Sequence, residues 1–209
     1  APYAGTGEVS LHLSARAADE AACEARMAPL LAEVRQRLGG YLYGEDISGL
    51  EEAVFRLCRD RHLTLSAAES CTGGLIAKRL TDVSGASQIF LGGVVSYTNE
   101  VKNHVLGVPA SLLEAYGAVS APVARAMAVG VRVLTGSDLS LSVTGLAGPG
   151  GDDRDTPVGT VFTALSAPEG VFVRRLTLGG SRESIRVLSA HHAFDLLRRY
   201  LTDQMTEGE

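Results

Sequence analysis

The chain of 209 residues has few of the residue types that mark several classes of protein. It contains no Trp, and aromatic residues make up only 5% of it, so the core must be built mainly from Leu, Val and Ala. The three cysteines are far apart, odd in number and include no CxxC pair, which argues against a disulfide framework and a thiolate zinc site. The five histidines show no metal-ligand spacing either. We therefore expect no metal site and no cofactor built on such ligands.

Long apolar runs and an excess of positive charge are also missing. No apolar run approaches the roughly 18 residues of a membrane-spanning helix, and no signal peptide is recognisable. Together with the unpaired cysteines, this pattern favours a cytoplasmic protein that does not bind a membrane. The net charge of −5 argues against general nucleic-acid binding, which requires a basic face. An anionic ligand would need a local cluster of hydrogen-bond donors.

The remaining composition is that of an ordinary globular protein, with 45% hydrophobic and 21% charged residues. The chain begins at Ala1 without Met, and we expect it to be part of a longer protein. Residues 8–15 alternate in the manner of a half-buried strand, residues 18–38 have the period of an amphipathic helix, and residues 41–43 are expected to form another short strand. This core is too small to stand alone, so we predict a small α+β fragment over residues 1–46.

From residue 47 onward, helices and strands alternate. Ser48 is expected to cap a helix, with Glu51 at the capping-box position. Strands are predicted over residues 63–68, 89–97, 139–144, 158–165 and 171–177, and helices over residues 75–80, 100–106, 111–116, 121–134 and 181–201. The last two strands are predicted to form a hairpin. The pattern predicts an α/β fold, a three-layer α/β/α sandwich with a mixed, mostly parallel sheet, over residues 47–209.

The most informative segment is SAAESCTGG, residues 66–74, which joins a predicted strand to a predicted helix. It places Ser70, Cys71 and Thr72 at a strand-to-helix turn, followed by Gly73. Two interpretations are open. Ser70 or Thr72 caps the helix, or the turn presents a nucleophile beside free N–H groups of the helix N-terminus.

Two further segments end strands in the same way. Residues 92–102 (GGVVSYTNEVK) and 142–151 (SVTGLAGPGG) bring hydroxyls, amides and glycines to strand ends. Parallel strands bring their carboxyl ends to one edge of an open α/β sheet, where ligands bind. The glycine-rich loop lacks the Gly-Lys-Ser/Thr of a P-loop and the third glycine of a dinucleotide-binding turn. It is either a connector or a nest of N–H groups for an anion.

Tyr97, Asn99 and Lys102 form the second group of candidates. Lys102 follows Asn99 by three residues, so on a helix the two side chains share one side. A lysine on a helix is usually solvated, but a buried lysine can lose its proton and act as a base. The position of Tyr97 at the strand end just before this helix favours the second interpretation.

The choice of nucleophile lies between Ser70 and Cys71. A thiol nucleophile normally requires a histidine partner. No histidine lies in the three segments, and His104 is the nearest. The sequence therefore favours Ser with Lys102 over Cys with His.

Several motifs together resemble one known family. AESCTGG, FLGGVVSYTNEVKNHVLGV (90–108), GAVSAPVARAMA (117–128), SVTGLAGPGG (142–151) and PVGTV (157–161) are similar, in order and spacing, to the CinA C-terminal domain family. That family is also described as nicotinamide-nucleotide amidohydrolase. The resemblance covers about residues 48–201, and the opening residues resemble the end of the KH-like middle domain of CinA proteins. It implies a partial KH-like fragment over residues 1–46 and an amidohydrolase domain over residues 47–209.

The resemblance implies hydrolysis of the carboxamide of nicotinamide mononucleotide to nicotinic acid mononucleotide and ammonia, without a metal or cofactor. Matched motif by motif, the catalytic residues are Ser70, Tyr97 and Lys102. The resemblance also implies that a second Ser, a Thr and an Arg assist, and these fall on Ser87, Thr144 and Arg182. The roles expected from the residues themselves add Thr72, Gly73, Asn99 and Gly145 to the substrate-binding set. The expected partner is a small nucleotide substrate, and the resemblance also implies a homo-oligomer.

Under this hypothesis Ser70 attacks the amide carbon and Lys102 takes its proton. Tyr97 holds Lys102 or relays a proton to the leaving ammonia. N–H groups near Thr72 and Gly73 stabilise the oxyanion. Because some family members lack the deamidase activity, a second hypothesis stays open: the same pocket holds a nucleotide without cleaving it, in a module for competence or recombination. An amidase for another substrate is the third.

Overall fold

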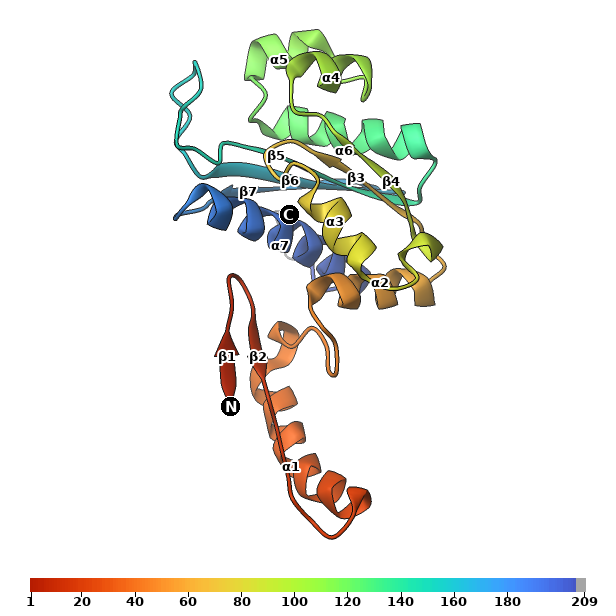
Figure 1. Ribbon diagram of the computed structural model, residues 1–209. Helices are drawn as coiled ribbons and strands as arrows, with labels where there is room; N and C mark the ends of the chain where they lie inside the picture. The colour runs from red at the N-terminus through yellow and green to blue at the C-terminus, as the bar shows by residue number, and fades with distance from the viewer. Residues whose placement is uncertain (206–209) are drawn as a thin grey trace. The chain divides into compact units, whose positions relative to one another are not determined.

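The computed structural model describes residues 1–205 and divides the chain into two compact units (Figure 1). The first unit is Ala1–Asp46 and the second begins at Ile47.

The first unit is a short hairpin followed by a helix. Strand β1 (Pro2–Ala4) pairs antiparallel with β2 (Val9–Leu11), and α1 spans Glu20–Leu38. Asp19 caps α1 by accepting a hydrogen bond of 2.8 Å from the N–H of Ala22.

Two expectations for this unit are corrected. The strand expected to be half buried is only three residues long and exposed, because two short strands have no second layer to cover them. The strand expected at residues 41–43 is replaced by a 3₁₀ turn, Gly39–Tyr41, since Gly39 leaves the helix with a φ of 51°. No residue of this unit is buried.

The second unit contains a five-stranded sheet of order β4-β3-β5-β6-β7. Its strands are β3 (Leu65–Glu69), β4 (Phe90–Val95), β5 (Leu139–Gly145), β6 (Thr160–Ala167) and β7 (Gly170–Thr177). Its helices are α2 (Leu50–Asp60), α3 (Leu75–Asp82), α4 (Asn99–His104), α5 (Ala110–Tyr116), α6 (Ala121–Thr135) and α7 (Arg182–Leu201), with a 3₁₀ turn η2 over Ala86–Gln88.

The strand directions confirm a mixed sheet. β3 pairs parallel with β4 and β5, whereas β6 pairs antiparallel with β5 and β7. Every strand except β6 therefore runs in the same direction. Because β3, β4 and β5 are parallel and adjacent, their carboxyl ends meet at one edge of the sheet.

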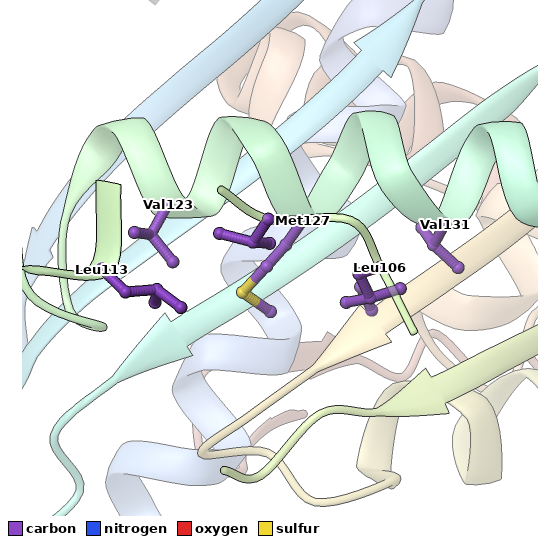
Figure 2. Packing of buried hydrophobic residues seen from close by; sticks show 7 residues of the cluster. Leu106, Leu113, Val123, Met127 and Val131 are labelled. Atoms are coloured by element: carbon purple, nitrogen blue, oxygen red, sulfur yellow. The ribbon is translucent and has the colours of Figure 1, made fainter. Parts of the chain in front are cut away.

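Helices cover both faces of this sheet, which confirms the three-layer α/β/α fold (Figure 1). On one face lie α4, α5 and α6, and on the other α2, α3 and α7. Figure 2 shows Val123, Met127 and Val131 of α6 beside Leu106 and Leu113, which belong to the α4–α5 segment. These side chains form one buried cluster, so the segment that contains α4 is held firmly against α6.

The start of α2 differs by one position from the expected capping box. The N-cap is Gly49, one residue later than Ser48. This moves the third helical position from Glu51 to Glu52, whose carboxylate accepts hydrogen bonds of 2.8 Å from both the N–H and the hydroxyl of Ser48. Ser181 caps α7, because its hydroxyl accepts a hydrogen bond from the N–H of Ser184.

Candidate active site

The turn after β3 lies at the edge where the parallel strands end. The N–H of Ser70 donates to the carbonyl of Val143 on β5 at 2.9 Å, so Ser70 continues the strand pairing by one residue. The chain then turns through Gly73 and Gly74, whose φ values of 61° and 94° are in the left-handed region that favours glycine. The side chain of Ser70 is thereby placed at the end of the central strands.

Lys102 points from α4 to this turn. Its Nζ donates to the Oγ of Ser70 at 3.1 Å and to the carbonyl of Ser96 at 2.7 Å. Lys102 is only 1% exposed, and burial lowers its pKa from 10.5 to about 8. About a tenth of these amines are therefore neutral at pH 7. A neutral amine beside a serine hydroxyl is an arrangement that can remove the hydroxyl proton.

Cys71 lacks the environment of a nucleophilic thiol. It is buried, and burial raises the pKa of its thiol to about 11, so the thiol keeps its proton at neutral pH. The sequence-based preference for Ser70 over Cys71 therefore agrees with the geometry.

Among the described residues, Tyr97 makes no hydrogen bond to the amine of Lys102. It is exposed, and its hydroxyl accepts a hydrogen bond of 3.1 Å from Arg182. Arg182 also donates to the carbonyl of Gly148 at 2.7 Å, so it joins the end of β4 to the glycine-rich loop. The amine of Lys102 is held instead by the carbonyl of Ser96, the residue before Tyr97.

The other candidates in the turn differ in accessibility. Thr72 is fully buried, and its Oγ1 has no hydrogen-bond partner among residues 1–205. The N–H of Gly73 donates to the carbonyl of Ser70 at 3.1 Å and is not free for a ligand. The expectation that Gly73 contributes an oxyanion donor is therefore wrong, because the tight turn uses that N–H itself.

Thr144, Gly145 and Asn99 lie near strand ends at the same edge. Thr144 is buried and donates its hydroxyl to the carbonyl of Ala118 at 2.7 Å, so its proton is already committed. Gly145 ends β5, and a side chain there would collide with Val161. Asn99 is the exposed first residue of α4, whereas Lys102 is buried, so their side chains do not share an environment.

Ser87 is not brought to this site by the chain. It is an exposed residue of η2, which precedes β4, whereas Tyr97 follows β4. The six residues of β4 separate the two by roughly 20 Å at about 3.3 Å per residue. Ser87 therefore lies toward the amino end of the parallel strands, opposite the edge that carries Ser70.

The structure adds three residues that sequence reasoning missed. Glu69 is 1% exposed, and its carboxylate accepts hydrogen bonds from the N–H groups of Gly74, Ile76 and Ala77 at 3.0, 3.0 and 2.9 Å. This carboxylate, rather than Ser70 or Thr72, caps α3. An acidic residue just before a helix start was the available signal.

Arg186 and Ser96 complete the group. Arg186 donates to the carbonyls of Cys71 and Thr72 at 3.1 and 2.7 Å. It follows Arg182 by four residues on α7, a spacing that places both on one side of the helix and that could have suggested its role. Ser96, fully buried, accepts from Lys102 and donates its N–H to the carbonyl of Glu69 at 2.7 Å.

The N-terminus of α3 is therefore closed to an external anion. Its first N–H groups are used by Glu69 and by the turn itself. Among the described residues, the N–H groups of Cys71 and Thr72, next to Ser70, donate to no other residue.

The acidic residues of the glycine-rich loop form a local turn. Asp152 accepts hydrogen bonds from the N–H groups of Arg154 and Thr156 at 3.1 and 2.9 Å. Over residues 1–205, no cluster of three or more His, Cys, Asp or Glu has the arrangement to hold a metal. Within the same residues, no helix is long and apolar enough to cross a membrane.

Two known domain models match the chain, one for each of its two units. The CinA C-terminal domain model matches residues 47–201, and the model of the damage-inducible protein CinA KH domain matches residues 1–44. The chain belongs to the CinA family. The first match spans the sheet and every site residue described above, and the second spans the N-terminal unit.

Individual CinA proteins and their solved structures are also similar to this chain. A CinA-like protein of Geobacter sulfurreducens is 51% identical over 93% of this chain and 46% of its own length, and one of Desulfovibrio desulfuricans is 48% identical over 100% of this chain and 50% of its own length. The chain thus spans about half the length of these relatives. The crystal structure of competence/damage inducible protein CihA from Agrobacterium tumefaciens is 37% identical with a TM-score of 0.71, covering 77% of this chain and 98% of that one. That of competence damage-inducible protein A from Klebsiella pneumoniae is 32% identical with a TM-score of 0.72, covering 75% and 97%.

Proposed function

We propose that the CinA C-terminal domain of this chain hydrolyses the carboxamide of nicotinamide mononucleotide to nicotinic acid mononucleotide and ammonia. The observation that carries the proposal is the contact of 3.1 Å between the buried amine of Lys102 and the hydroxyl of Ser70. The contact supports acyl transfer by a serine nucleophile with a lysine base. The nucleotide substrate follows from the family resemblance.

The first half of the reaction uses this pair. Neutral Lys102 takes the proton from Ser70 as Oγ attacks the carboxamide carbon, and the carbonyl π electrons move to oxygen. The N–H groups of Cys71 and Thr72 stabilise the resulting oxyanion. Protonated Lys102 then gives its proton to the amide nitrogen, the C–N bond breaks, ammonia leaves, and an acyl ester on Ser70 remains.

The second half returns the enzyme to its starting state. Neutral Lys102 takes a proton from a water molecule, whose oxygen attacks the ester carbon. Collapse of this second tetrahedral intermediate breaks the bond to Oγ, and Lys102 returns the proton to Ser70. The product is nicotinic acid mononucleotide, whose new carboxylic acid gives its proton to the released ammonia and becomes a carboxylate. No step requires a metal or a redox cofactor.

The substrate phosphate is assigned to Arg182 and the glycine-rich loop. Arg182 is exposed, and within residues 1–205 its hydrogen-bond partners are neutral, the Tyr97 hydroxyl and the Gly148 carbonyl. A guanidinium can exchange such neutral partners for a phosphate in a charge-assisted, bidentate contact. Thr144 is a weaker candidate, because its hydroxyl proton is donated to Ala118.

The experiment is an assay of ammonia release with nicotinamide mononucleotide, with nicotinic acid mononucleotide identified as the co-product. We expect equimolar release of both and full activity after treatment with a chelator. Binding of the nucleotide without ammonia would contradict the proposal and favour a nucleotide-binding module. Activity lost to the chelator and restored by a divalent ion would contradict the serine–lysine chemistry.

A further inference from the structure

Glu69 occupies an unusual position for a helix cap. An ordinary N-cap side chain belongs to the residue immediately before the helix and bonds an N–H two or three residues later. Glu69 instead belongs to strand β3, and its carboxylate bonds the N–H groups of residues five, seven and eight positions later. The hydrogen bonds therefore bridge the whole turn from Ser70 to Gly73.

The same residue also fixes the base. The backbone carbonyl of Glu69 accepts from the N–H of Ser96 at 2.7 Å and from its hydroxyl at 3.3 Å. The carbonyl of Ser96 in turn accepts from Lys102, which reaches Ser70. The side chain of Glu69 is thus bonded to the end of the turn that carries Ser70, and its main chain is linked through Ser96 to Lys102.

We propose that Glu69 is a positioning residue for Ser70, which holds the nucleophile turn in the conformation that places Oγ on the amine of Lys102. The inference rests on the proposed function. Arg186 opposes Glu69 by binding the carbonyls of Cys71 and Thr72, so the turn is tied by its N–H groups on one side and by its carbonyls on the other. The N–H groups of Cys71 and Thr72, which Glu69 does not use, are left for the oxyanion.

The charge and shape of Glu69 are both required. Its Oε2 accepts from Gly74 and Ile76, and its Oε1 accepts from Ala77. Glutamine offers only one acceptor oxygen and would turn an NH₂ group toward an N–H group. At least one buried donor in Glu69→Gln would lose its acceptor, and the turn must shift to restore it.

The test compares Glu69→Gln with Glu52→Gln, a matched control. Glu52 also caps a helix start in this unit, through Ser48, but touches none of the site residues. For Glu69→Gln we expect kcat to fall about 100-fold, the loss that a displacement of about 1 Å can produce, with KM changed less than about threefold. Glu52→Gln should keep the wild-type kcat even where its melting temperature falls as far.

A second readout does not depend on the nucleotide. The rate at which a fluorophosphonate probe labels Ser70 should fall in Glu69→Gln as kcat does, with Ser70→Ala as the blank. A wild-type protein that is labelled at Ser70 but releases no ammonia would contradict the proposed function alone. A wild-type protein that is not labelled would overturn both proposals.

Folding is checked by circular dichroism below the melting temperature of each variant. If Glu69→Gln does not fold, the decisive variant is Glu69→Asp, which keeps the charge but is one methylene shorter and should lose at least about tenfold in kcat and labelling rate. A folded Glu69→Gln, or in its absence a folded Glu69→Asp, with wild-type kcat and labelling rate would overturn the inference.

Discussion

At the scale of single residues, the chemistry depends on the protonation of Lys102. Its side chain is surrounded by the apolar interior and by neutral oxygen atoms from Ser70 and Ser96. Burial without a carboxylate partner disfavours the ammonium form, which is why the pKa falls to about 8. The same burial keeps the Cys71 thiol protonated. In the proposed mechanism, the same burial thus favours the neutral amine that acts as base and disfavours the thiolate of Cys71.

The pH dependence of kcat/KM follows from this pKa. The active form is the neutral amine, so the rate should rise with pH, by about tenfold from pH 6 to pH 7, and level off above about 8. A pH–rate profile that is flat over this range would remove Lys102 from the mechanism and leave Tyr97 as the next candidate base.

Substitution of Lys102 is an independent test of its role as a base. Lys102→Arg keeps a permanent positive charge and cannot accept a proton, so we expect a loss of at least about 100-fold in kcat. The matched control is Lys78→Arg, because Lys78 is exposed and paired with Asp82 on α3. It should retain wild-type activity. Equal activity of the two variants would contradict the role of Lys102.

At the scale of elements, the placement of α4 depends on a close contact with α6. A Cβ at Gly130 would lie 1.9 Å from the carbonyl oxygen of Leu106, just after α4. Glycine inside a helix costs about 1 kcal/mol relative to alanine, and here it is required by the approach of another segment. This contact adds to the apolar cluster around Met127 in holding the lysine in place (Figure 2).

Gly130→Ala should therefore destabilise the protein, although the same change stabilises an open helix. We expect a loss of about 1–3 kcal/mol, as for other overpacked sites, from urea unfolding monitored by circular dichroism. The control is Gly150→Ala in the glycine-rich loop, where a Cβ meets nothing within 4 Å. Its unfolding free energy should be unchanged. An equal or higher stability of Gly130→Ala would contradict the packing described here.

The elements also show which parts of the site the sequence could predict. Ser70 and Lys102 were brought together correctly because both follow parallel strands, and the topology of such strands fixes where their ends meet. Tyr97 follows β4, as Lys102 does. The direction of an exposed side chain, however, depends on its partner, and the partner of Tyr97 is Arg182, which is distant in sequence. Ser87 was inferred from a motif alone, and its position before β4 excludes it from this edge. The acidic residue ahead of a helix start was a signal for Glu69, but its bonds to N–H groups five to eight residues later depend on the fold of the turn.

At the scale of the whole molecule, the site belongs entirely to the second unit. In the part of the chain that the structure describes, the buried side chains and the catalytic candidates lie beyond residue 47, whereas the first unit has no buried residue. The five-stranded sheet with helices on both faces supplies its own core. The expected homo-oligomer stays a prediction.

Removal of residues 1–46 should leave the chemistry intact. A chain of residues 47–209 contains the whole sheet and its helices, so we expect it to fold and to keep kcat/KM within about twofold, since no site residue is lost. Steady-state ammonia release by the two forms at equal concentration checks this. A folded but inactive truncated chain would show that the first unit takes part in the reaction.

The central claim, that Ser70 is the nucleophile of an amide hydrolysis, is tested most directly by ammonia release from nicotinamide mononucleotide with Ser70→Ala and Cys71→Ala side by side. Neither hydroxyl nor thiol caps a helix, so both variants should keep the fold. The account predicts that Ser70→Ala still binds the nucleotide but loses at least about 1,000-fold in kcat, as expected for a missing nucleophile, and that Cys71→Ala stays close to wild type. An active Ser70→Ala, or an inactive but folded Cys71→Ala, would contradict it.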